Sequence, residues 1–217
     1  MSELAYNVRR STRARRVLVT VDPRAGVEVV LPKRAAAREA AAAVAELRPW
    51  IERRLREAAA VRAQLDARGD SVPFLGRTLS LLAQDGRSRV HRRGDTLLVP
   101  AGDHQPALER WYRRVAREEF GTRLDRASRL AGHDYAGLTI RGQRTRWASC
   151  SADGRMSFNW RLLLAPEEVV DYVVWHEVCH LEVHDHSPRF WRLLESRCPE
   201  YRRHARWLRL HGATLVL

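Results

Sequence analysis

Lysine is almost absent from this sequence: Lys33 is the single lysine, and arginine supplies the other basic residues. With 39 lysines and arginines against 26 aspartates and glutamates, the formal net charge is +13. An excess of this size favours contact with nucleic acid or a nucleotide, because clustered cations attract polyanions. Arginine, alanine and leucine also dominate the whole chain, as they do in proteins from GC-rich genomes. The charge therefore suggests a phosphate-rich partner without establishing one.

Cysteine is scarce, and long apolar runs are missing. The three cysteines include no C-x-x-C pair, which argues against a disulfide framework and for a reducing compartment. The N-terminal MSELAYNVRRSTRARR carries charges where a signal peptide requires an apolar core. No run approaches the roughly 18 uncharged residues that a bilayer span requires. We therefore expect a cytoplasmic protein that makes no membrane contact.

Residues 1–100 have the pattern of strands around a helical segment. β-Branched segments at 15–22 and 26–32 flank Pro-Arg-Ala-Gly, which predicts a β-hairpin. Helix-forming residues fill 34–68, and the proline in Leu47–Pro49 predicts two helices with a break at that point. Short strands with glycine-containing turns complete this part.

A long helix marks the start of the C-terminal part. Apolar residues at helical spacing predict that it runs from about 106 to Gly132. The segment Ala101–Pro106 is the best boundary between a β-rich part, 1–100, and a C-terminal part, 101–217. The 217 residues, with 45% hydrophobic content, could also form one continuous domain.

The C-terminal part alternates strands and helices. Alternating residues on either side of Ala152-Asp153-Gly154 predict a hairpin. A helix follows with Pro166 in its first turn. A further helix is expected after Ser187, a typical N-cap residue, with Pro188 at its first position.

The stretch Val173–Trp191 carries an H-E-x-x-H pattern formed by His176, Glu177 and His180. On a helix the two histidines lie one turn apart on one face, so their imidazoles can converge on one Zn²⁺ ion. Glu177 lies about 100° further round, where it would hold a water molecule rather than the ion itself. The helix is apolar nearly all round and should be buried, so these polar side chains require partners. A metal would supply them; the alternative is that the histidines make hydrogen bonds inside the core.

A third ligand is required, because catalytic Zn²⁺ takes three protein ligands and keeps one exchangeable position. His184 would lie on the same face if the helix continued, but ligands about 6 Å apart along the axis cannot all converge on one ion. His186 follows a break, since HDHSP combines a capping residue with proline. A chain that turns there can bring His186 back to the other two histidines. We favour His186, with His184 as the alternative.

The segments RGQRTRWASCS and MSFNWRLLLAPEEVVDYVVWHEVCHLEVHDHSPRFW resemble the YgjP-like metallopeptidases, relatives of the SprT-like zincins. A weaker resemblance extends to the N-terminal part, so that it covers most of the chain. The resemblance implies an α+β, zincin-like fold whose active-site helix packs against a small antiparallel sheet, preceded by a β-hairpin and helix part. It also implies His176, His180 and His186 as the Zn²⁺ ligands and Glu177 as the catalytic acid/base.

The motif and the resemblance together predict a zinc-dependent metallopeptidase, in which Glu177 acts as general base on a Zn²⁺-activated water. The segment containing Trp147, Ser149 and Cys150 suits an edge strand that pairs with an extended peptide substrate. Arg144, Arg146 and Tyr172, three further candidates, could contact the substrate or the transition state. Five aromatic residues are expected to wall the site rather than to stack bases: Trp147, Trp160, Trp175, Phe190 and Trp191.

Two other functions remain open. The first is metal-dependent phosphohydrolysis of a nucleoside triphosphate, and the second is a DNA-associated, SprT-like protease. The positive charge favours both. Against the first, the sequence has no P-loop and no carboxylate cluster for Mg²⁺; against the second, it has no zinc finger or helix-turn-helix.

Overall fold

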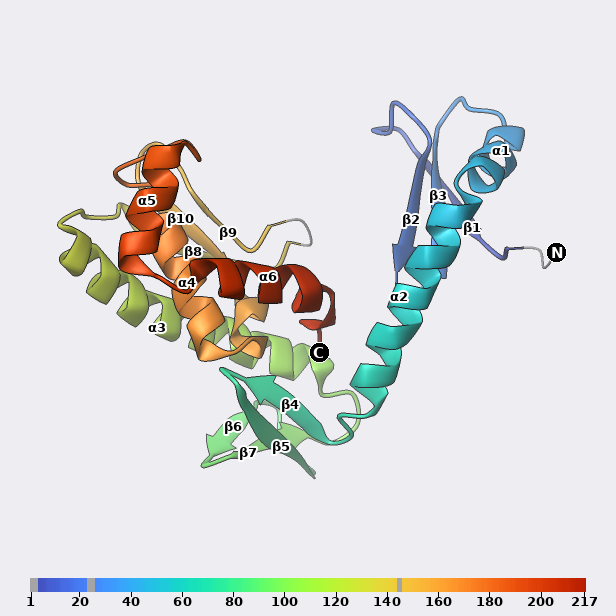
Figure 1. The fold of residues 1–217 in the computed structure, drawn as a ribbon. Coiled ribbons are helices and arrows are strands. Elements are labelled where there is room, and N and C mark those ends of the chain that lie inside the picture. The colour runs from blue at the N-terminus through green and yellow to red at the C-terminus, as the bar shows by residue number, and fades with distance from the viewer. Residues whose placement is uncertain (1–3, 23–25, 144–145) are drawn as a thin grey trace. The chain divides into compact units, whose positions relative to one another are not determined.

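The computed structural model describes residues 4–22, 26–143 and 146–217 of the chain (Figure 1). The chain divides into two compact units, Met1–Gly69 and Asp70–Leu217. No helix among the described residues is long and apolar enough to cross a membrane.

The first unit is a three-stranded sheet with helices on one face. Its elements are β1 (Asn7–Ser11), β2 (Leu18–Asp22), β3 (Gly26–Pro32), α1 (Arg38–Glu46) and α2 (Arg48–Asp66). The strand order is β1-β3-β2, with β1 parallel and β2 antiparallel to β3. Alternate residues of β3, namely Val27, Val29 and Leu31, form a core with Val44 of α1 and Ile51 of α2. The period of two along β3 thus sets which face of the sheet the helices cover.

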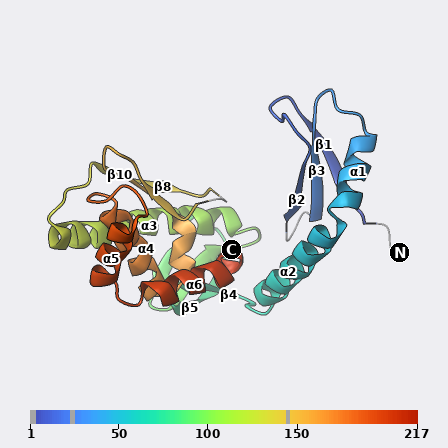
Figure 2. The ribbon, with the colours of Figure 1, turned by 45° about the horizontal axis from the view of Figure 1, so that its top comes forward.

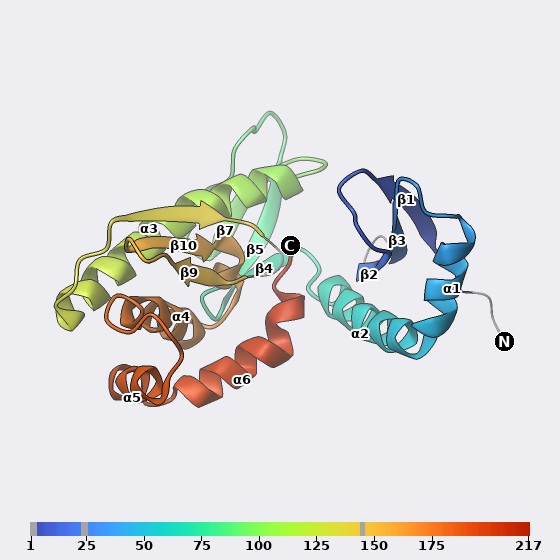
Figure 3. The same cartoon turned by 90° about the horizontal axis from the view of Figure 1, so that it is seen from above.

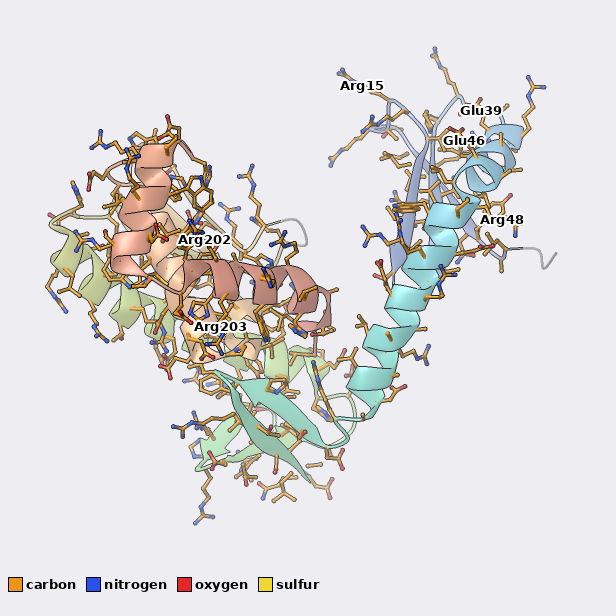
Figure 4. The ribbon with its side chains drawn as sticks, viewed as in Figure 1. Arg15, Glu39, Glu46, Arg48, Arg202 and Arg203 are labelled. Carbon is orange, nitrogen blue, oxygen red and sulfur yellow. The ribbon has the colours of Figure 1, made fainter. Side chains whose placement is uncertain are left out.

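The sequence pattern of the first unit predicts most of its elements. The strand expected at 26–32 is β3, the strand expected at 15–22 is shortened to β2, and their turn at 23–25 lies outside the described residues. The helix break is confirmed at Leu47, where φ is −91° and ψ is 6°. Strand β1 is not predicted from the sequence, and its residues are nearly all exposed. Figure 4 shows Arg15 extending outward from the segment between β1 and β2.

The second unit contains two sheets and the remaining helices. Its elements are β4 (Ser71–Phe74), β5 (Arg77–Gln84), β6 (His91–Arg93), β7 (Thr96–Pro100), α3 (Gln105–Ala131), β8 (Gly137–Arg141), β9 (Ala148–Cys150), β10 (Arg155–Asn159), the 3₁₀ helix η1 (Trp160–Leu164), α4 (Glu167–Cys179), α5 (Pro188–Arg197), α6 (Tyr201–His211) and the 3₁₀ helix η2 (Gly212–Thr214). The long helix predicted from 106 is α3, and Gly132 ends it with φ of 74°, a backbone conformation that favours glycine.

The sheet β4-β5-β7-β6 packs on the first half of α3. The ring of Phe74 lies 5.5 Å from that of Trp111, and the hydroxyl of Tyr112 donates a hydrogen bond to the carbonyl of Pro73. These contacts place the sheet in the same compact unit as the C-terminal helices. The boundary between the units therefore lies after Gly69, before the segment Ala101–Pro106. The composition changes there because the element type changes from strand to helix, while the core continues across it.

The second sheet has the order β8-β10-β9 and is mixed rather than purely antiparallel, which corrects the expected arrangement. The β9–β10 hairpin forms around 152–154 as predicted, but β8 pairs parallel to the other edge of β10. In Figure 3, α4, α5 and α6 lie beyond β9, at one edge of this sheet. Figure 2 shows α3 and α4 beneath one face of the sheet. Phe120 of α3 and Phe158 of β10 stack at 4.7 Å in this layer, both fully buried.

The fragment Asp70–Leu217 should fold by itself, because its core shares no residue with the core of the first unit. We expect the isolated fragment to give a helical circular dichroism spectrum and one cooperative thermal transition. Calorimetry of the fragment beside the full chain is the measurement. A fragment that aggregates or melts without cooperativity would show that the second unit needs the first.

Candidate metal centre

Helix α4 positions the first part of the H-E-x-x-H motif. Pro166 takes the N-cap position, one residue before the first turn in which the sequence places it. Apolar side chains on several sides of the helix are almost fully buried: Val169, Val170, Val173, Val174 and Val178. The helix ends at Cys179, and His180 follows as its C-cap. The motif therefore lies where a buried helix stops.

The chain reverses direction immediately after α4. The backbone N–H of Val183 donates to the carbonyl of Cys179 at 2.9 Å, and the Val183 side chain is buried. The carboxylate of Asp185 then accepts a hydrogen bond from the backbone N–H of Ser187 at 3.0 Å. Ser187 takes the predicted N-cap position of α5, although its own side chain makes no capping bond. This compact connection returns His186 to the end of α4.

Three imidazoles meet at this point. Each of His176, His180 and His186 offers a ligand atom, and these atoms lie within 4.8 Å of one another. The Nε2 atoms of His176 and His186 are 3.0 Å apart, while Nδ1 of His180 contacts the carbonyl of Val183 at 3.0 Å and leaves its Nε2 available. Donor atoms around a tetrahedral metal ion lie roughly 3.3 Å apart, so three nitrogen atoms this close together could hold a metal ion. His184 is exposed and does not belong to this group.

Phe190 of α5 forms the floor beneath the three rings. Its ring centroid lies 5.0 Å from that of His176, 4.5 Å from His180 and 4.8 Å from His186, and the side chain is fully buried. Trp191 adds a side wall 5.5 Å from His186. Both residues therefore take the wall positions predicted for them, which hold the imidazoles in place.

The other three aromatic residues expected around the site make contacts elsewhere. Trp160 is buried in the main core, Trp175 lies beneath Arg197, and Trp147 packs closely against Gly212. Their closeness to the motif in the sequence does not bring their side chains to the metal centre, because successive residues of a helix or strand point in different directions.

Burial keeps His176 and His180 in the form that binds metal. The pKa of His176 falls to about 3, first because the ring is buried and then because His180 and His186 are close. Burial also lowers the pKa of His180. Neutral imidazole has a free lone pair for an ion, whereas imidazolium has none.

Glu177, which follows His176 on α4, is buried and only 5% exposed. Burial raises its pKa to about 7, while a hydrogen bond from the backbone N–H of Cys150 and the charge of Arg146 act in the opposite direction. A carboxyl group that titrates near neutrality can accept and return a proton, as a general base must. A divalent cation among the histidines would draw this pKa down again.

Strand β9 forms the edge of its sheet next to Glu177. The carbonyl of Trp147 accepts from Asn159, and the N–H of Ser151 donates to Arg155, so alternate residues of this segment bond to β10. The backbone groups of Ser149 likewise face β10, while those of Ala148 and Cys150 face the open edge of the sheet. The segment expected to pair with a peptide is therefore an edge strand beside the candidate base.

Two of the three candidates for transition-state contacts, Tyr172 and Arg146, lie close to residues of the motif. Tyr172 lies one turn before His176 on α4, with ring centroids 6.0 Å apart, and burial raises the pKa of its hydroxyl. Arg146 is exposed and close enough to affect the charge of Glu177. Arg144 lies outside the described residues.

His204 of α6 is a neighbour of the site that the sequence analysis misses. It is 9% exposed, and its ring lies 6.4 Å from that of Tyr172, on α4 beside the motif. No spacing connects His204 to H-E-x-x-H. The one available signal is the amphipathic pattern of α6, which marks this position as inward-facing.

A buried helix whose two histidines converge with a third, returning histidine is an arrangement found in metal-dependent hydrolases. The model of the YgjP-like family, described as a metallopeptidase domain, matches residues 15–211. The chain therefore belongs to the YgjP-like family and carries a metallopeptidase domain.

The chain is similar to the metallopeptidase zymogen abylysin of Pyrococcus abyssi, with 26% identity over 41% of this chain and 91% of that chain and a TM-score of 0.38. No curated protein matches the chain.

Replacing Glu177 by glutamine should stabilise the metal-free protein increasingly as the pH rises. The carboxyl group ionises near 4.5 in the unfolded chain and near 7 in the folded one, so unfolding releases a proton between these values. The wild type therefore loses stability as the pH rises through this window, by up to roughly 3 kcal/mol relative to Glu177→Gln. Denaturant unfolding with chelator present, at several pH values, measures the difference. A difference that does not change with pH would contradict the buried, neutral carboxyl.

Proposed function

We propose that the chain is a zinc-dependent peptidase with His176, His180 and His186 as the ligands of Zn²⁺. The observation that carries the proposal is the convergence of three imidazole donors within 4.8 Å, two of them on a helix that also carries the buried Glu177. Three nitrogen ligands leave one coordination position open, which is the arrangement of catalytic rather than structural zinc sites. The family supports a peptidase, and the donor set supports zinc.

The catalytic step assigned to the protein itself is proton transfer by Glu177. When bound, Zn²⁺ would lower the pKa of water and polarise the carbonyl of the scissile bond. Glu177 accepts the proton of the attacking water and delivers it to the leaving amine. Its buried position and its hydrogen bond from the backbone N–H of Cys150 hold the carboxyl group at the edge of β9. Burial also excludes bulk water, which strengthens each electrostatic interaction in the site.

The substrate proposed for this site is an extended peptide. The open edge of β9 offers the backbone groups of Ala148 and the carbonyl of Cys150, whose N–H already donates to Glu177, so a peptide can add as a further strand. Trp147 and Ser149 belong to the same edge strand segment. Arg146 and Tyr172 are the described side chains proposed to contact the substrate or the developing oxyanion.

The alternatives of a nucleotide phosphohydrolase and a DNA-associated protease have less support. Within the described residues, the one group suited to a metal consists of the three histidines, with no carboxylate cluster of the kind that Mg²⁺ prefers. The positive charge remains the argument for both alternatives. Activity and DNA-binding measurements separate these two alternatives from the proposed zinc-dependent peptidase.

Metal content tests the ligand assignment. The wild type should bind about one Zn²⁺ per chain, and His186→Ala should lower the affinity more than about 100-fold, beyond the effect of losing a supporting hydrogen bond. His184→Ala is the matched control, because it removes a neighbouring exposed histidine and should leave Zn²⁺ binding intact. Elemental analysis and competition with a chelator measure both. Equal loss in the two variants, or none in either, would contradict the assignment.

Hydrolysis tests the role of Glu177. Glu177→Gln should keep its Zn²⁺ but lose about 10² to 10⁴ in kcat with casein, because the amide cannot accept the proton. Casein and UTP are offered in parallel to the wild type and the variant. Hydrolysis of UTP alone would replace the peptidase by a phosphohydrolase. Salt-dependent DNA binding, with casein cleavage, would support the DNA-associated protease.

A further inference from the structure

A cleft of about 590 Å³ lies in the second unit between the β5–β6 loop and the first turns of α3. Six residues line it: Arg89, Val90, Ala107, Arg110, Trp111 and Arg114. The four from α3 follow the spacing of one helix face. None of them belongs to the metal centre. The volume falls in the range of sites that hold drug-sized ligands or short peptide segments.

The walls of the cleft are cationic. Arg89, Arg110 and Arg114 are exposed, and the lining contains no acidic residue. Among the described residues, Arg89 and Arg110 make no ion pair or side-chain hydrogen bond, and Arg114 has only a distant contact with Glu118 at 3.9 Å. The carboxylate of Asp103 accepts a hydrogen bond from the backbone N–H of Gln105 at 3.2 Å, so the N-terminus of α3 is already capped and the arginines carry the charge of the cleft. An anion therefore finds several donors here whose charge is not already neutralised.

The floor of the cleft is apolar and fixed by aromatic packing. Val90, Ala107 and Trp111 are each at most 8% exposed. Trp111 makes an edge contact with Tyr112 at 4.9 Å and a tilted contact with Phe74 at 5.5 Å. Rotation of the indole would break both contacts, so the cleft exists before a ligand arrives and needs little ordering to bind one.

We propose that this cleft binds an extended, acidic segment of a polypeptide. Carboxylates match the fork of the arginine guanidinium, and the apolar floor accepts the aliphatic side chains or backbone between them. Single-stranded nucleic acid fits less well, because it needs an aromatic face on which bases stack and Trp111 is only 5% exposed. The binding concerns a surface apart from Glu177 and does not depend on whether the metal centre cleaves peptides.

The test is equilibrium binding of a labelled peptide with alternating acidic and leucine residues, followed by fluorescence anisotropy. The full-length, zinc-loaded Glu177→Gln protein is used, so that cleavage cannot consume the probe. The acidic peptide should bind with an affinity that falls as salt rises, while its asparagine and glutamine counterpart should bind at least about tenfold more weakly. Arg110→Glu and Arg114→Glu, each made singly, should weaken the acidic peptide about tenfold or more.

Arg126→Glu is the matched control, because Arg126 is an exposed arginine on the same helix outside the cleft. It changes the net charge equally and should leave the affinity within about twofold. Circular dichroism confirms that the variants fold. The proposal is overturned by equal binding of the neutral peptide, by equal losses in Arg126→Glu, or by no binding. It is also overturned if a single-stranded oligonucleotide or inorganic pyrophosphate competes as strongly as the unlabelled acidic peptide.

Discussion

The chain reversal after α4 is the constraint on which the metal centre depends. A straight helix can present two histidines one turn apart, but a third at the next turn would lie too far along the axis to share their ion. The reversal solves this problem within a few residues, because it returns His186 and also supplies the Val183 carbonyl that contacts Nδ1 of His180. Phe190, which packs beneath all three rings, follows directly in α5. One short connection therefore sets both the return of the third ring and the orientation of the second.

The burial that suits the site to its chemistry also lowers the stability of the folded chain. Removing water from Glu177 raises its pKa to about 7, and removing water from His176 keeps that ring neutral. Each effect reflects a polar group that would be more stable in solvent. The surrounding layer compensates through apolar burial, with Phe120 stacked on Phe158 where α3 meets the sheet. A cation bound by the histidines would add stability to the folded chain alone.

The sequence predicts the local parts of this structure better than its long-range pairings. The break at Leu47, the end of α3 at Gly132 and the N-cap at Ser187 follow from single residues with strong backbone preferences. The strand β1 was not predictable in this way, because its exposed, arginine-rich residues lack the alternation of a half-buried strand. His204 shows the corresponding limit in the site, since it approaches Tyr172 through the packing of α6 on α4. Pairing and packing across the chain leave no fixed spacing in the sequence.

The arginines show why net charge alone cannot separate function from coding bias. Arg123 is 16% exposed, and its guanidinium is shared among Glu119, Glu167 and Asp171, so its charge is neutralised where α3 meets α4. Arg89 and Arg110 belong to the same chain and the same compositional excess, yet within the described residues they face a cleft without an acidic partner. A bias in coding raises the number of arginines, but it does not arrange unpaired ones around a rigid apolar floor. The placement of the charge, rather than its sum, is therefore the property that points to a ligand.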